Sequence, residues 1–147
     1  MVLTRTAWDD CALALRAHLM TYGDWGDRVG VEHVEASTPR PYVIIYFVGG
    51  GRLLESHSKD ANLLVGVKCV ADTLGLANQG AFRIMTLLED NGEGDKRTDS
   101  TATPVVAGEF EILTITEERA LAYAEDFEKT RNIYHAGFVY RIRMEER

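Results

Sequence analysis

The four histidines are the first residues in this sequence that could support chemistry. His18 falls in a predicted helix, His33 and His135 in predicted strands, and His57 in a predicted loop. None of them has another histidine, a cysteine or a carboxylate at a metal-binding spacing such as H-E-x-x-H. We therefore expect no metal site in this protein.

Two loops share features with ligand-binding motifs but lack residues that those motifs need. The segment from Asp90 to Asp95 is acidic like a calcium loop, yet glycine occupies its third and fifth positions, where oxygen ligands belong. Gly49-Gly50-Gly51-Arg52 follows a predicted strand, as a phosphate-binding loop does, but the lysine and hydroxyl residue of that motif are missing. The sequence favours an acidic turn and a glycine hairpin with positive φ angles, and no cofactor.

Nucleophilic catalysis also lacks its usual signature. No serine lies in a G-x-S-x-G motif, and neither Cys11 nor Cys69 has a local partner that would lower its pKa. Both cysteines lie in apolar-patterned segments, so we expect them to be small buried side chains. The chain is therefore not expected to be an enzyme and has no candidate catalytic residue, although carboxylates assembled from distant positions remain an open alternative.

The negative charge of the chain is concentrated in one stretch. The sequence has 23 acidic and 16 basic residues, and residues 89–128 hold 12 of the acidic residues against three basic ones. This excess disfavours a nucleic-acid-binding surface, because phosphate affinity depends on clustered lysine and arginine. A solvated loop with an exposed helix face explains the stretch, and so does an acidic surface that repels DNA or steers a basic partner.

Length and hydropathy favour one domain that spans residues 1–147. With 46% hydrophobic residues the chain can build a core without disulfides or metals. Its longest apolar run, Tyr42 to Val48, is far shorter than the roughly 20 residues of a membrane helix. The first residues lack the apolar stretch of a signal peptide, so we expect a protein that stays in the cytoplasm where it is made and contacts no membrane.

Hydrophobic periodicity predicts an α+β fold, in which two or three helices pack on a mainly antiparallel sheet of four to five strands. The first helix starts with Thr6 as its N-cap and ends before Gly23, and the second is capped by Asp72 or Thr73 and runs to Leu88. The apolar face of this second helix is formed by Ala77, Ala81, Ile84 and Leu88, and Gly80 would let the helix approach the sheet closely. The third helix follows the apolar spacing Ala120, Leu121, Ala124 and Phe127 from residue 116 to 131. The strands are expected at 29–34, 42–48, 63–70, 110–115 and 134–144. In the third of them the odd-numbered residues from Leu63 to Cys69 should face the core, and the alternate set, which includes Lys68, should lie on the other face.

For two of these strands the sequence also predicts which faces are covered. Residues 42–48 are apolar at every position, which predicts a central strand that is covered on both faces and ended by Gly49-Gly50-Gly51. The last strand alternates apolar residues with a second set that includes His135, Arg141 and Arg143. That cationic second face is either solvated or meets another subunit.

The order of these features resembles the tail terminator, or tail-completion, proteins of long-tailed bacteriophages. The resemblance is carried by an N-terminal helix, the Pro-flanked strand Pro39-Arg-Pro-Tyr-Val-Ile-Ile, the strand-helix unit from Leu63 to Leu88, and the final strand. Its most specific piece is Tyr134-His135-Ala-Gly137 leading into Tyr140-Arg-Ile-Arg143. It covers most of the chain but leaves residues 89–128 unmatched.

The resemblance implies a non-enzymatic virion protein that caps the tail tube as a ring of six copies, stops tube elongation and presents the surface to which the head joins. Its partners would be further copies of itself, the tail tube protein and a head-completion or neck protein, and DNA would only pass through. Assembly would take place in the host cytoplasm, and the finished protein would lie in the tail or neck of the virion. We expect subunit or tube contacts at Tyr134, His135, Arg141, Arg143, Arg40 and Arg52, and an acidic loop or channel lining at Glu89, Asp90, Glu93, Asp95 and Asp99.

Three alternatives stay open from the sequence. The chain could be another neck or tail assembly component, such as a head-completion or tube-associated protein. It could be a small enzyme, for which a deep apolar pocket with converging titratable groups would be expected. It could also be a bacterial binding module.

Overall fold

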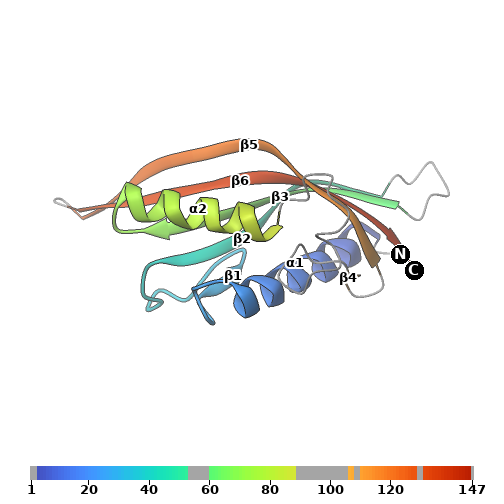
Figure 1. Ribbon diagram of the computed structural model, residues 1–147, viewed down its shortest axis with the longest axis horizontal. Coiled ribbons are helices and arrows are strands. Elements are labelled where there is room, and N and C mark those ends of the chain that lie inside the picture. Colours follow the sequence, from blue (N-terminus) through green and yellow to red (C-terminus); the bar gives the residue numbers. More distant parts are fainter. Residues whose placement is uncertain (1–2, 53–59, 89–105, 108–109, 129–130, 147) are drawn as a thin grey trace.

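The computed structural model describes residues 3–52, 60–88, 106–107, 110–128 and 131–146. Within them, two helices, α1 (Leu3–Tyr22) and α2 (Leu74–Leu88), pack on one face of a six-stranded sheet, as Figure 1 shows. The strands are β1 (Val29–Val31), β2 (Tyr42–Arg52), β3 (Asp60–Ala71), β4 (Val106–Ala107), β5 (Phe110–Glu128) and β6 (Arg131–Glu146). Neither helix of the described residues is long and apolar enough to span a membrane.

The sheet has the strand order β1-β2-β3-β6-β5-β4. Only β1 and β2 pair in parallel, and the other four pairs are antiparallel. The α+β class and the mainly antiparallel sheet are confirmed, and two short edge strands, β1 and β4, bring the sheet to six. β5 and β6 run side by side as a long curved ribbon along the molecule (Figure 1).

The core lies between the helices and one face of the sheet. Alternate residues of β3 point into it, as the pattern of the third strand predicts: Leu63, Val65, Val67 and Cys69 are fully buried. β6 contributes its even-numbered residues, among them Tyr140, Ile142 and Met144. Both cysteines are free and buried, and burial raises the pKa of the Cys11 thiol to about 12 and that of Cys69 to about 11. The expectation that they are small buried side chains is confirmed.

Helix α2 follows its prediction closely. The Thr73 hydroxyl accepts a hydrogen bond from the Leu76 backbone N–H at 3.1 Å, so Thr73 is the N-cap. The predicted apolar positions Ala77, Ala81, Ile84 and Leu88 are buried. A Cβ atom added at Gly80 would lie 2.3 Å from the Cys69 sulfur, so the glycine does permit the close approach of α2 to β3.

The third predicted helix is wrong, because residues 116–128 belong to strand β5. The glutamates, alanines and leucine of this segment are good helix formers, and their spacing imitates a helical face. In the structure the segment pairs with β6 almost to the end of the hairpin, and three bulges along β5 interrupt the strict alternation that would have marked a strand. Pairing with a distant strand therefore overrides the local helix propensity.

Smaller differences from the predictions concern the ends of three elements and the cover of β2. The first helix begins at Leu3, so Thr6 lies inside it and is not its N-cap, and the first strand ends at Val31. β2 does not end at the three glycines but continues through them to Arg52, with a bulge between Phe47 and Gly49 and a φ of 90° at Gly50. The helices cover only one face of β2, where Val43 and Ile45 are buried, while Tyr42, Ile44 and Tyr46 on its other face are half-buried.

Candidate functional site

The face of the sheet opposite the helices, here called the open face, carries most of the polar side chains of the central strands. Registered rows of residues cross it from strand to strand. One row joins Tyr42, Val70, His135 and Tyr123, and the neighbouring row joins Ile44, Lys68, Gly137 and Leu121. A third row joins Tyr46, Gly66, Val139 and Arg119. Side chains from four strands therefore meet on this face.

His135 lies on the open face of β6, directly opposite Tyr123 of β5. Its ring stacks on Tyr123 with centroids 4.4 Å apart and an angle of 9° between the planes. Its Nε2 lies 2.8 Å from Oε2 of Glu125, so the carboxylate selects the tautomer that carries the proton on Nε2. Burial lowers the pKa of His135 below its ordinary value, Lys68 lowers it further, and the hydrogen bond to Glu125 opposes them. The imidazole is therefore favoured in its neutral form.

Lys68 joins two aromatic side chains across this face. Its ammonium donates a hydrogen bond to the Tyr123 hydroxyl at 2.7 Å and lies within 5.4 Å of the centroids of the Tyr46 and Tyr123 rings. The Tyr46 ring lies directly over Gly66, where an added Cβ would come within 2.0 Å of it. Burial raises the pKa of Tyr46, which keeps its phenol protonated. We call Tyr46, Lys68, Tyr123, Glu125 and His135 the open-face cluster.

A second polar group lies further along β6. Arg141 donates hydrogen bonds to the Glu118 carboxylate and, at 3.2 Å, to the side-chain oxygen of Asn62. Glu118 occupies the bulge between Glu117 and Arg119, which turns its carboxylate toward Arg141. Lys68 and Arg141 are therefore both engaged by side chains of the same molecule.

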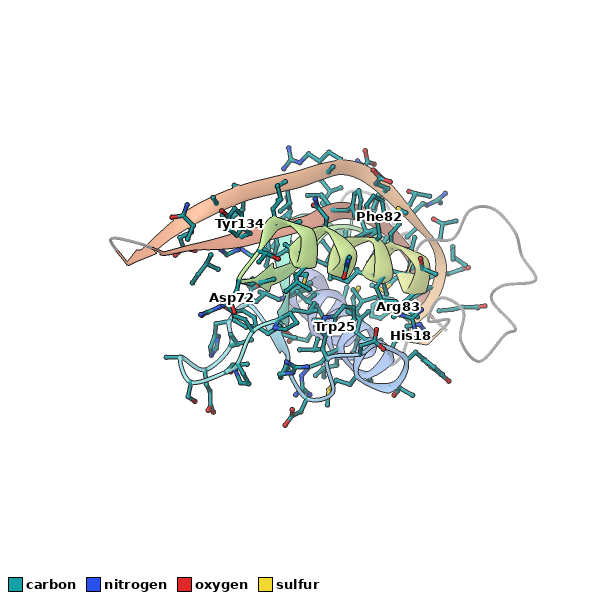
Figure 2. All side chains as sticks on the ribbon, turned by 60° about the vertical axis from the view of Figure 1, so that its left-hand side comes forward. His18, Trp25, Asp72, Phe82, Arg83 and Tyr134 are labelled. Carbon is teal, nitrogen blue, oxygen red and sulfur yellow. The ribbon has the colours of Figure 1, made fainter. Side chains whose placement is uncertain are left out.

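The structure brings together some of the residues that the sequence predicts for an interface. His135, Arg141 and Arg143 all lie on the open face of β6, since they occupy alternate positions of that strand. Tyr134 points to the opposite face and is half-buried near the start of α2 (Figure 2). Arg40 lies apart from them, bonded through Nε to the Asp72 carboxylate at 2.6 Å.

The remaining predicted residues are not brought to a common site. Arg52 ends β2, and its side chain lies outside the described residues. The five acidic residues predicted for the loop or channel lining, Glu89, Asp90, Glu93, Asp95 and Asp99, also lie outside the described residues.

The sequence patterns did not identify most of the open-face cluster. Tyr123 and Glu125 were assigned to a helix, where residues two apart do not share a face. The alternation Arg119, Leu121, Tyr123 and Glu125 was the signal that could have placed them beside His135. Lys68 was placed correctly on the second face of the third strand, but its partners on that face could not be named without β5.

Two hollows formed by described residues lie away from the open face. One of about 450 Å³ beside β1 is lined by polar residues, among them Arg16 and Arg28, whose Nε atoms donate to the backbone oxygens of Val29 and Trp25. A second of about 370 Å³ lies between α2 and β5 and is mainly apolar, with Glu117 as its one titratable lining residue. Neither of these two hollows combines an apolar lining with several converging titratable groups.

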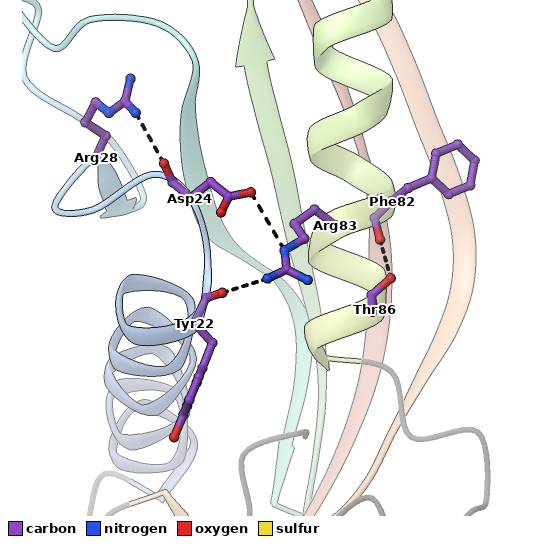
Figure 3. Close-up of polar contacts among 6 residues, drawn as sticks. All are labelled: Tyr22, Asp24, Arg28, Phe82, Arg83 and Thr86. Atoms are coloured by element: carbon purple, nitrogen blue, oxygen red, sulfur yellow. Dashed lines mark hydrogen bonds and ion pairs between the residues drawn. The ribbon is translucent and has the colours of Figure 1, made fainter. Parts of the chain in front are cut away.

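Helix α2 has two different flanks, as Figure 3 shows. On one flank Arg83 donates to the backbone oxygen of Tyr22 at 3.0 Å and lies 3.8 Å from the Asp24 carboxylate, so it joins α2 to the end of α1. On the other flank Phe82 projects toward β5 and β6, and its side chain is 59% exposed.

No protein-family model matches this sequence, and no curated protein matches it. Among solved structures, the chain is similar to a chain of the virion of a native gene transfer agent particle. The TM-score is 0.65 at 16% sequence identity, and the match covers 91% of this chain and 93% of the other. At this level of identity the likeness establishes a shared fold.

Proposed function

We propose that this chain is a structural virion protein that closes the end of a phage tail tube as a ring of six copies. In this role it stops tube elongation and forms the surface to which the head or neck joins. The observation that carries the proposal is the fold shared, over nine-tenths of both chains, with a component of a gene transfer agent virion. The protein would act as one non-enzymatic domain, assembled in the host cytoplasm and located in the virion.

The charge of the stretch 89–128 supports this role. It holds 12 acidic residues against three basic ones, and one of its glutamates, Glu118, is bonded to Arg141 of β6. A channel lined by such groups would let DNA pass without binding it, because like charges repel and no phosphate contact forms.

The proposed subunit and tube contacts centre on the open face of β6. His135, Arg141 and Arg143 occupy one face of β6, and a heterologous contact between neighbouring copies is what closes a ring. We assign these residues to contacts with the next copy or the tail tube protein. Tyr134 and Arg40, which lie elsewhere on the fold, and Arg52 are assigned to contacts of the same kind. Glu89, Asp90, Glu93, Asp95 and Asp99 would face the channel, where DNA is only passing cargo.

The experiment that tests the role is electron microscopy of particles assembled without this chain. Loss of a tail terminator leaves tube growth unchecked, so we expect overlong tails without heads, and supplying the chain from a plasmid should restore normal length. Tails of normal length that lack heads would contradict the proposal and assign the chain to another neck or head-completion step.

A further inference from the structure

The outer edge of β5 is open along one regular stretch. β4 pairs only with Phe110 and Glu111, so no strand of the described residues covers β5 beyond them. The bulges of β5 leave its ladder with β6 uninterrupted over residues 119–125. An open edge presents unpaired backbone N–H and C=O groups that can bind another strand. The described part of β5 contains neither proline nor lysine to block such pairing.

The stretch 119–125 is complementary to itself in charge. It begins with Arg119 and ends with Glu125, each three positions from Ala122, and both side chains lie on the open face. When two copies of the stretch pair antiparallel about Ala122, Arg119 of each copy lies directly opposite Glu125 of the other. Opposite charges in this position stabilise a strand pair. A shift by two residues in either direction removes both ion pairs and brings a bulge into the ladder, so charge and strand regularity select the same register.

Both charged side chains are accessible for this contact. Arg119 is exposed and makes no ion pair with another residue that the structure describes. The Glu125 side chain is 58% exposed, and only its Oε2 is engaged, by Nε2 of His135. Because the imidazole is favoured in its neutral form, the carboxylate keeps its negative charge, and Oε1 can accept a hydrogen bond from an arginine. The bond to His135 therefore orients Glu125 without neutralising it.

The helix side of the stretch also fits a second copy. Ala120, Ala122 and Ala124 are exposed on this side, and their small side chains let another strand approach without a clash. Phe82 of α2 contacts Phe138, which is paired with Ala120, at a centroid distance of 6.5 Å and is still 59% exposed. In the selected register Ala124 of the second copy lies beside Ala120. The Phe82 ring would extend over it, and each copy would cover the other in the same way.

We propose that residues 119–125 pair antiparallel with the same residues of a second copy, which joins the two sheets into one across a two-fold axis at Ala122. The order of charges along the stretch selects a second copy as the occupant, because the stretch supplies the partner of each of its own charged ends. This closed, two-fold contact differs from the heterologous contacts proposed for the ring. It concerns the free chain and does not depend on the tail-end role.

Sedimentation velocity over a concentration series tests the pairing, with a reversible dimer expected for the wild-type chain. Arg119→Glu and Glu125→Arg each place two pairs of like charges opposite one another, so each should raise the dissociation constant by about tenfold or more. An equimolar mixture of these two variants should dimerise again, because both contacts of the mixed dimer join an acid to a base. This recovery would also show that both variants are folded. Glu35→Arg, the same change of charge at an exposed residue between β1 and β2, is the matched control and should leave dimerisation unchanged.

A second pair of variants tests the apolar contact. Phe82→Ser should raise the dissociation constant by about tenfold, because the cover of an aromatic ring is lost in each copy. Leu76→Ser should not, because Leu76 is exposed on the other flank of α2, beside Trp25. Single charge variants that dimerise like the wild type, or a mixture of them that stays monomeric, would overturn the proposal. A wild-type chain that is monomeric at every concentration would also overturn it and leave the β5 edge to a strand of another protein.

Discussion

The Tyr123 ring of β5 lies parallel to the His135 ring of β6, with the two centroids 4.4 Å apart. The two residues are directly opposite in the ladder, and the pair is extended by Glu125 on one side and Lys68 on the other. Aromatic pairs between adjacent strands stabilise a sheet and fix its register. This contact therefore helps hold β5 as a strand on the open face, where no helix covers it.

The lowered pKa values of two histidines predict a pH dependence of stability. The pKa values of His135 and His18 are both lowered by burial from the ordinary value of 6.5. The unfolded chain consequently binds more protons than the folded chain near and below that pH, so the free energy of unfolding should fall as the pH decreases through it. In urea titrations at a series of pH values, His135→Asn should reduce the change of the free energy of unfolding with pH by an amount equivalent to less than one bound proton. A variant with the same pH dependence as the wild type would contradict the lowered pKa of His135.

The contact between α2 and β3 predicts opposite effects at two glycines of one helix. Gly80→Ala would place a methyl group 2.3 Å from the Cys69 sulfur, and overpacking of this kind destabilises by about 1–3 kcal/mol. Gly75→Ala meets nothing within 4 Å, so the higher helix propensity of alanine should stabilise the protein by up to about 1 kcal/mol. Equal midpoints of urea unfolding for the two variants would contradict this account of the packing.

The two contacts of Arg83 between α1 and α2 should contribute unequally to stability. Arg83→Met removes both the hydrogen bond to the Tyr22 carbonyl and the ion pair with Asp24, and should lower the free energy of unfolding by about 1 kcal/mol. Asp24→Asn removes only the exposed ion pair and should cost less than about 0.5 kcal/mol. If Asp24→Asn proved as destabilising as Arg83→Met in urea titrations, the ion pair and not the carbonyl contact would be the main link.

The acidic residues of the stretch 89–128 predict an effect on DNA passage. Simultaneous replacement of Glu93, Asp95 and Asp99 by lysine should slow DNA ejection from assembled particles, because a cationic channel would bind phosphate. The same reversal at the exposed residues Asp9, Asp27 and Glu35, which changes the same number of charges, is the control and should leave ejection unchanged. Normal ejection and DNA retention with the triple variant would contradict a channel location.

The sequence predicted α2, β3 and β6 because their local patterns agree with their tertiary environment. Thr73 caps α2, and the alternating sets of β3 and β6 point to the core and the open face as expected. The prediction for residues 116–128 is wrong because their helix propensity conflicts with a pairing that only strand β6 supplies. For the same reason the open-face cluster could not be predicted. His135 and Lys68 could be placed on their own strands, but Tyr123 and Glu125 could not be placed beside them.

Native mass spectrometry of the chain, alone over a concentration series and after addition of polymerised tail tube, tests the proposed ring most directly. The account predicts a closed species of six copies, formed either in solution or on the tube end. A chain that stays monomeric at every concentration and does not bind the tube end would contradict it.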